Sequence, residues 1–152
     1  MSRFSKYTIK KLKQAGWRPN RRVDISKTIE LLDKNYCTYT KDMLDFLLEF
    51  QDLLLEFDNG EEAFDFTLHE SWVNQKNCIF HNSLFEESVY SIGVMNNCDL
   101  IVLISELNKV YAMTEKGSEL YLLGDTFDRG IEFICTYGLS DNIEIFNKRK
   151  IY

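Results

Sequence analysis

The stretch LLLEFDNGEEAFDFTL, residues 53–68, predicts a β-hairpin that turns at Asn59-Gly60. Asn-Gly between two alternating apolar runs is the strongest short-range hairpin signal, because a type I′ turn requires positive φ at both central residues. With a two-residue loop, Leu55 lies opposite Phe64, and side-chain alternation then gives the hairpin one apolar face and one acidic face. The apolar face, which we expect to join the core, carries Leu53, Leu55, Phe57, Phe64, Phe66 and Leu68.

The second face of this hairpin is acidic. Six carboxylates fall between residues 52 and 65, a segment that contains no Lys or Arg. Two interpretations stay open: the charges guard an edge hairpin against pairing with other strands, or they form a docking patch for a basic protein. A flat hairpin face offers no cleft for a sugar, which disfavours a glycosidase pair of carboxylates. The candidate partner-binding residues are Glu56, Asp58, Glu61 and Asp65.

Helical periodicity precedes the hairpin, and strand periodicity follows it. Three helices are expected before residue 51: one over about 7–15, one opened by Asp24 or Ser26, and one from about Thr40. Further strands are expected at 89–94, 100–104, 110–113 and 120–123. Asp125 or Thr126 should cap a last helix that ends before Gly138. Between the hairpin and the next strand, we expect a loop at residues 71–82 and a short helix at residues 83–88.

This order of elements predicts an α+β fold. An antiparallel sheet of about five or six strands follows the N-terminal helices and precedes a C-terminal helix, so the helices should cover one face or one end of the sheet. The 152 residues suit one domain. We expect residues 1–152 to form it, with a basic N-terminal arm at 1–22 and a short basic tail at 148–152.

The net charge of −6 is unevenly distributed. Residues 1–22 carry +8, residues 23–147 carry −17, and the tail carries +3. An acidic body repels nucleic acid and anionic lipid and attracts basic proteins, so we expect a protein partner and neither nucleic acid nor a membrane. The arginines around Trp17 have the composition of a nucleic-acid arm. The acidic body instead favours a buried Trp17, with the arginines paired to the chain's own acids.

No catalytic or metal-binding pattern is present. The chain lacks GxSxG, HExxH, GxGxxG and P-loop motifs, and its two histidines, His69 and His81, fall in polar surroundings. Cys78 and His81, with His69 nearby, lack the paired spacing of a zinc site. We therefore expect no enzyme activity, no catalytic residues, no cofactor and no metal. The cysteines at 37, 78, 98 and 135 should be reduced, and the absence of a secretory signal or membrane span predicts a cytoplasmic protein.

Several short motifs together resemble the SUKH superfamily of bacterial immunity proteins. The segments that carry the resemblance are Ala15-Gly16-Trp17-Arg18-Pro19 with Arg21-Arg22-Val23, Phe46-Leu47-Leu48-Glu49-Phe50, Ser91-Ile92-Gly93, Leu103-Ile104 with Val110-Tyr111, and Leu123-Gly124-Asp125-Thr126 running to Tyr137-Gly138. Two departures are visible: Gln51-Asp52 stands where the family often has Gly-Gly, and Asn108 stands where it usually has Gly. Asn tolerates the left-handed conformation, so that turn can be kept.

The resemblance implies an α+β domain without enzymatic activity that neutralises a cognate toxin of a polymorphic toxin system. Many such toxins are nucleases, and the acidic body fits a basic nuclease, because an acidic inhibitor is attracted to a surface built for nucleic acid. Related domains elsewhere act as regulatory scaffolds, which is the alternative function. The family's motifs look like fold determinants, so the candidate partner-binding residues rest on the hairpin alone. The oligomeric state stays open.

Overall fold

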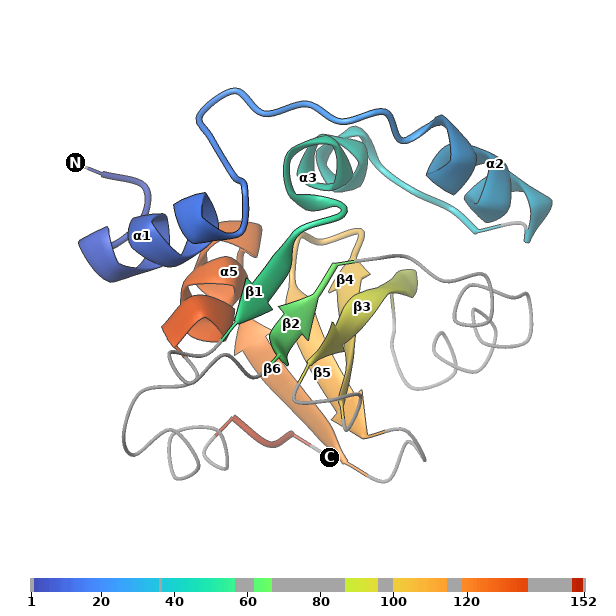
Figure 1. Cartoon of the computed structure of the whole chain (residues 1–152). Helices are drawn as coiled ribbons and strands as arrows, with labels where there is room; N and C mark the ends of the chain where they lie inside the picture. Colours follow the sequence, from blue (N-terminus) through green and yellow to red (C-terminus); the bar gives the residue numbers. More distant parts are fainter. Residues whose placement is uncertain are drawn as a thin grey trace.

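A computed structural model describes residues 2–35, 37–56, 62–66, 87–95, 100–114, 119–136 and 149–151. Over this part of the chain, helices precede and follow one antiparallel sheet in which each strand pairs with the next along the sequence (Figure 1). The fold is therefore α+β, as the sequence predicts. The elements are α1 (Lys6–Gln14), α2 (Ser26–Lys34), α3 (Lys41–Phe50), β1 (Leu54–Glu56), β2 (Glu62–Asp65), β3 (Val89–Met95), β4 (Leu100–Ser105), β5 (Val110–Thr114), β6 (Leu120–Gly124) and α5 (Phe127–Thr136).

Side-chain caps set where the helices begin. The hydroxyl of Thr40 accepts a hydrogen bond from the Met43 amide at 3.1 Å, and the hydroxyl of Thr126 accepts one from the Arg129 amide at 3.2 Å. Both satisfy amides that a helix leaves without an intrahelical partner. The predicted helix start near Thr40 is confirmed, and of the two candidate caps for the last helix it is Thr126 that caps it, whereas the expectation that Asp24 or Ser26 is the N-cap of α2 is wrong. At α2, Asp24 binds the Ser26 amide from outside, and the residue in the N-cap position is Ile25.

The hairpin pairs as predicted at its open end and differs nearer its turn. Leu55 lies opposite Phe64, but Glu56 lies opposite Glu62 rather than Ala63, because the register shifts by one residue between Leu55 and Glu56. The predicted pairing is therefore confirmed at Leu55 and is wrong at Glu56. The predicted turn itself, and residues 67–86 with their expected loop and short helix, lie outside the described residues.

Three described residues take backbone conformations that glycine usually supplies, and the first of them is Asn20, with φ = 63°. Asp52, between α3 and β1, has φ = 68°, and Asn108, in the turn between β4 and β5, has φ = 64°. Both belong to the departures from the glycines of the family that the sequence resembles, Gln51-Asp52 and Asn108. Asp and Asn are the non-glycine residues best suited to left-handed backbone, so both turns are kept.

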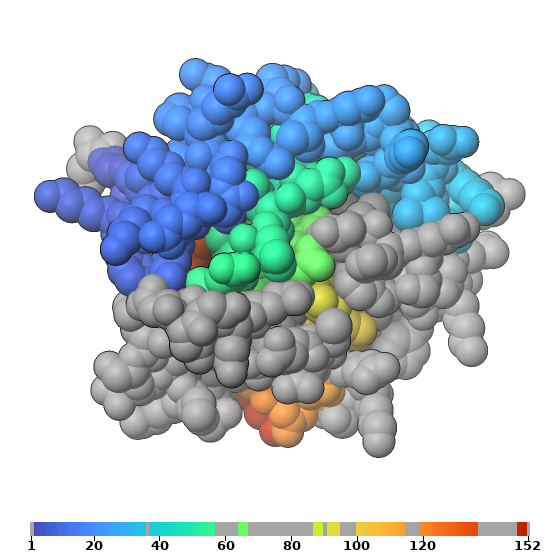
Figure 2. Space-filling view, in the orientation of Figure 1, coloured from blue at the N-terminus to red at the C-terminus, as the bar shows by residue number. Residues whose placement is uncertain are grey.

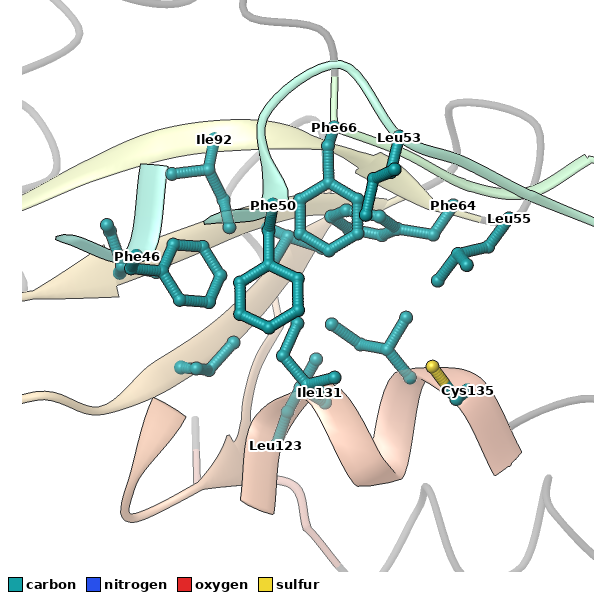
Figure 3. Packing of buried hydrophobic residues seen from close by; sticks show 14 of the residues in the cluster. Phe46, Phe50, Leu53, Leu55, Phe64, Phe66, Ile92, Leu123, Ile131 and Cys135 are labelled. Atoms are coloured by element: carbon teal, nitrogen blue, oxygen red, sulfur yellow. The ribbon is translucent and has the colours of Figure 1, made fainter. Parts of the chain in front are cut away.

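One face of the sheet packs against the helices and forms the main core. Figure 3 shows Phe50 of α3 between Phe66 of the hairpin and Ile131 of α5, and all three belong to the main cluster of buried residues. The rings of Phe50 and Phe66 stack at 6.0 Å. The predicted apolar row is confirmed for its four described members: Leu53, Leu55, Phe64 and Phe66 are all at most 2% exposed.

The other face of the sheet is also apolar over β3 to β6. Leu103 and Met113 are 0% and 1% exposed, in a second cluster that does not include the helices. The continuous apolar run 100–104 is therefore buried on both faces, as its composition predicts. This second cluster ends before the hairpin, where Leu54 is 43% exposed.

Each edge of the sheet is covered by another part of the chain. Residues 149–151 pair with β6 through the Leu122 amide to the Arg149 carbonyl at 2.9 Å and the Ile151 amide to the Leu120 carbonyl at 2.8 Å. At β1, the Nζ of the buried Lys11 donates to the Glu56 carbonyl at 3.2 Å. Occupied edges limit pairing with foreign strands.

Candidate functional site

The acidic face of the hairpin is described at two of its four predicted positions. Glu56 is exposed at the end of β1, and Asp65 is half-buried on β2, between two buried phenylalanines. Both side chains lie on the face of the hairpin opposite the core. Asp58 and Glu61 lie outside the described residues, so the structure brings together Glu56 and Asp65 only.

Asp65 lies in a row of side chains that crosses the whole sheet. Register places it between Leu54 of β1 and Val94 of β3, and Val94 is 3% exposed. The acidic patch therefore borders the apolar second face of the sheet. A partner that reached Asp65 would contact charged side chains and Leu54 together, the mixture typical of protein interfaces.

Trp17 is part of the folded body rather than a free arm. It is 9% exposed, packs edge-on against Phe4 with ring centroids 6.3 Å apart, and its indole Nε1 donates to Glu49 Oε1 at 3.0 Å. Arg3 donates to the same Glu49 oxygen at 2.7 Å and also pairs with Asp128 of α5 at 2.7 Å. The prediction that Trp17 packs into the protein is confirmed.

The arginines that follow Trp17 have different partners from those predicted. Arg21 donates to the backbone carbonyls of Glu49 and Gln51, at the C-terminal end of α3, where cations interact favourably with the helix dipole. Arg18 is exposed and has no partner among the described residues. The prediction that these arginines pair with the chain's own acids is therefore wrong for Arg21, which binds backbone carbonyls instead.

A pocket of 530 Å³ lies between α5 and β6, a feature that the sequence did not indicate. Arg149 lines this pocket. Its guanidinium lies 4.3 Å from the ring centroid of Phe133 and donates a hydrogen bond to the Leu123 carbonyl at 2.9 Å. Arg129 and Asp125 form an exposed ion pair at 2.9 Å on the same wall. The two arginines are balanced by Asp125 and Glu132, so the pocket selects for neither charge. It is lined by Leu122, Gly124, Asp125, Arg129, Glu132, Phe133, Thr136 and Arg149.

The described residues hold no cluster of three or more His, Cys, Asp or Glu side chains that could bind a metal ion. His69, His81 and Cys78 lie outside them.

Cys135 is a free thiol, and burial raises its pKa to about 12. Cys37 is disulfide-bonded, so the expectation of reduced cysteines is wrong at that position. Among the described helices, none has the length and apolarity needed to cross a bilayer.

Helices on one face of an antiparallel meander define an α+β protein. The family model described as SUKH-3 immunity protein matches residues 4–137. The chain therefore belongs to the SUKH-3 immunity protein family. No curated protein and no solved structure matched the chain.

Proposed function

We propose that this protein binds a cognate toxin and neutralises it by stoichiometric contact, without catalysis of its own. The observation that carries the proposal is the SUKH-3 immunity protein match, which spans residues 4–137 and so includes all described helices and strands. Membership over nearly the whole chain favours a role for the intact fold rather than for a short motif.

Electrostatics support a basic toxin, and nucleases are the class that most often presents such a surface. Residues 23–147 carry −17, and a nuclease needs a positive surface to hold its substrate. Opposite charges raise the rate at which two proteins meet, by one or more orders of magnitude at low salt. An inhibitor with this charge would therefore reach a basic toxin quickly, before the toxin acts.

The docking surface that we propose is the acidic hairpin face, with Glu56, Asp58, Glu61 and Asp65 as contacts. Exposure of Glu56 and partial exposure of Asp65 support this placement, and Leu54 beside them provides an apolar contact. We assign these residues to partner binding and none of them to catalysis.

The function is tested with the toxin domain encoded by the adjacent gene. Co-expression should restore growth to cells that produce the toxin domain, and the purified proteins should form a one-to-one complex by light scattering. A regulatory scaffold would instead bind several unrelated proteins and give no protection. Toxin that remains active with a molar excess of this protein present would contradict the proposal.

A further inference from the structure

Residues 149–151, which we call the tail strand, pair with the outer edge of β6. The Leu122 amide donates to the Arg149 carbonyl at 2.9 Å, and the Ile151 amide donates to the Leu120 carbonyl at 2.8 Å. β6 is the last strand in the order of the sheet, so this edge would otherwise present backbone groups without strand partners. The tail strand therefore occupies a site at which an extended peptide can add to the sheet.

The side chains of the tail strand indicate which residues this edge accepts. The guanidinium of Arg149 lies 4.3 Å from the ring centroid of Phe133 and donates to the Leu123 carbonyl at 2.9 Å. The Nζ of Lys150 pairs with Glu119 at 3.1 Å. An aromatic face, a carbonyl and a carboxylate all attract cations. The edge of β6 is therefore suited to an extended segment that carries two adjacent basic residues.

Few contacts hold the tail strand in place. Among the described residues, it has two backbone hydrogen bonds to β6, the contacts of Arg149 and one ion pair whose side chains are 46% and 39% exposed. The side chain of Ile151 is 56% exposed and so buries little apolar surface. Chain ends with so few contacts open readily. A segment that makes more contacts with the same edge can therefore displace the tail strand.

The family match separates this edge from the tail strand. It spans residues 4–137, which include β6 and α5 but not residues 149–151. The tail strand is thus an addition that covers the last strand of the matched fold. Arg149 also lines the pocket between α5 and β6, so release of the tail strand would open that pocket further.

We propose that the edge of β6 is a second docking site, which takes an extended basic segment of a partner protein as an added strand, and that the tail strand occupies it until the partner displaces it. The partner segment places one basic side chain over Phe133 and the next against Glu119, as the tail strand does.

This site is separate from the acidic hairpin. β1 and β6 are the two opposite edges of the sheet. In Figure 2, orange atoms, the colour of β5 and β6, reach the surface at the lower side of the view, apart from β1 and α1. The proposal does not depend on which protein is the partner, so it can hold or fail independently of the proposed toxin.

A full-length variant that releases the tail strand tests the site. Ile151→Pro removes the amide that donates to the Leu120 carbonyl, whereas the control Ile151→Ala keeps that amide. The probe is a fluorescein-labelled peptide of residues 147–152, and fluorescence anisotropy measures its binding. The peptide should bind Ile151→Pro about tenfold more tightly than wild type or Ile151→Ala, because an attached strand competes at a high effective concentration.

An exchange of charges tests the contact with Glu119. In the Ile151→Pro background, Glu119→Lys should weaken peptide binding about fivefold, because Lys150 of the peptide then meets a like charge. A peptide with Lys150→Glu should restore the binding of this double variant. The control Glu30→Lys makes the same charge change on α2 and should leave peptide binding unchanged.

Amide hydrogen exchange of wild-type protein provides a measurement that requires no variant. The Leu122 amide, which binds the Arg149 carbonyl, should exchange about tenfold faster than the amide of Ala112, which lies between β4 and β6 in the sheet.

Three results would each overturn the proposal: a Leu122 amide that exchanges as slowly as that of Ala112, a peptide that binds Ile151→Pro no more tightly than wild type, or peptide binding that Glu119→Lys leaves unchanged. A wild-type dimer that Ile151→Pro dissociates would also overturn it, because the occupant of the edge would then be the tail of a second copy.

Discussion

The indole of Trp17 and the carboxylate of Glu49 are joined by a hydrogen bond of 3.0 Å across 32 positions of sequence. Arg3 donates to the same carboxylate oxygen at 2.7 Å, so one side chain of α3 holds two parts of the N-terminal segment. This shared carboxylate is why the basic segment belongs to the fold despite its charge. Residues 1–22 carry a charge of +8, and without such contacts this charge would favour an extended, solvated arm.

Replacement of Trp17 tests how much this contact stabilises the protein. Trp17→Ala should lower the free energy of unfolding by about 3–5 kcal/mol, because a buried aromatic is lost and Glu49 loses a donor. The exposed neighbour gives a control, Arg18→Ala, for which we expect a change within about 0.5 kcal/mol. Urea titration followed by circular dichroism measures both. An unchanged midpoint for Trp17→Ala would show that the segment is dispensable for folding.

Charge reversal tests the proposed toxin-docking surface. Glu56→Lys/Asp65→Lys should slow association with a cognate toxin domain by about tenfold at low salt, since attraction becomes repulsion. The effect should shrink above about 0.15 M salt, where charges more than about 8 Å apart are screened. Stopped-flow fluorescence measures the rate. The control Glu30→Lys/Asp33→Lys makes the same charge change on α2, and an equal loss of rate in both variants would argue for a general effect of net charge.

Cys135 should resist alkylation while the protein is folded. Its pKa is raised to about 12, chiefly because burial disfavours the thiolate, and the unfolded thiol ionises near 9. The stability that this contributes is fully present below pH 9 and is lost as the pH rises toward 12. Iodoacetamide at pH 8 should leave the Cys135 peptide unmodified in buffer and should modify it fully in denaturant, as read by mass spectrometry. Rapid labelling under native conditions would mean that α5 opens readily.

The contact between β6 and α5 requires glycine at position 124. A Cβ on Gly124 would overlap the backbone nitrogen of Gly130, and neither backbone can move away independently. Gly124→Ala should therefore destabilise the protein by about 1–3 kcal/mol, as overpacking generally does. Lys27→Ala on the exposed face of α2 serves as the control, and thermal unfolding compares the two. A Gly124→Ala protein as stable as wild type would show that α5 shifts away at little cost.

The sequence alone determined the α+β class, the order of the elements and the apolar row of the hairpin. These follow from local rules: side chains alternate along a strand, apolar residues recur every three to four positions in a helix, and a hydroxyl such as that of Thr126 caps an amide a few residues away. The SUKH resemblance rests on motifs of the same local kind, and the family match over residues 4–137 confirms it.

Only the tertiary structure decided which distant residues meet. The shift in register at Leu55 and the partners of Arg21 could not be read from spacing, because each depends on how separate elements pack. The same holds for the buried Lys11, whose charge predicts an exposed position but whose Nζ donates to the Glu56 carbonyl of β1. Local periodicity predicts which face of a helix or strand is buried. Only the packing of the elements decides which residues each face contacts.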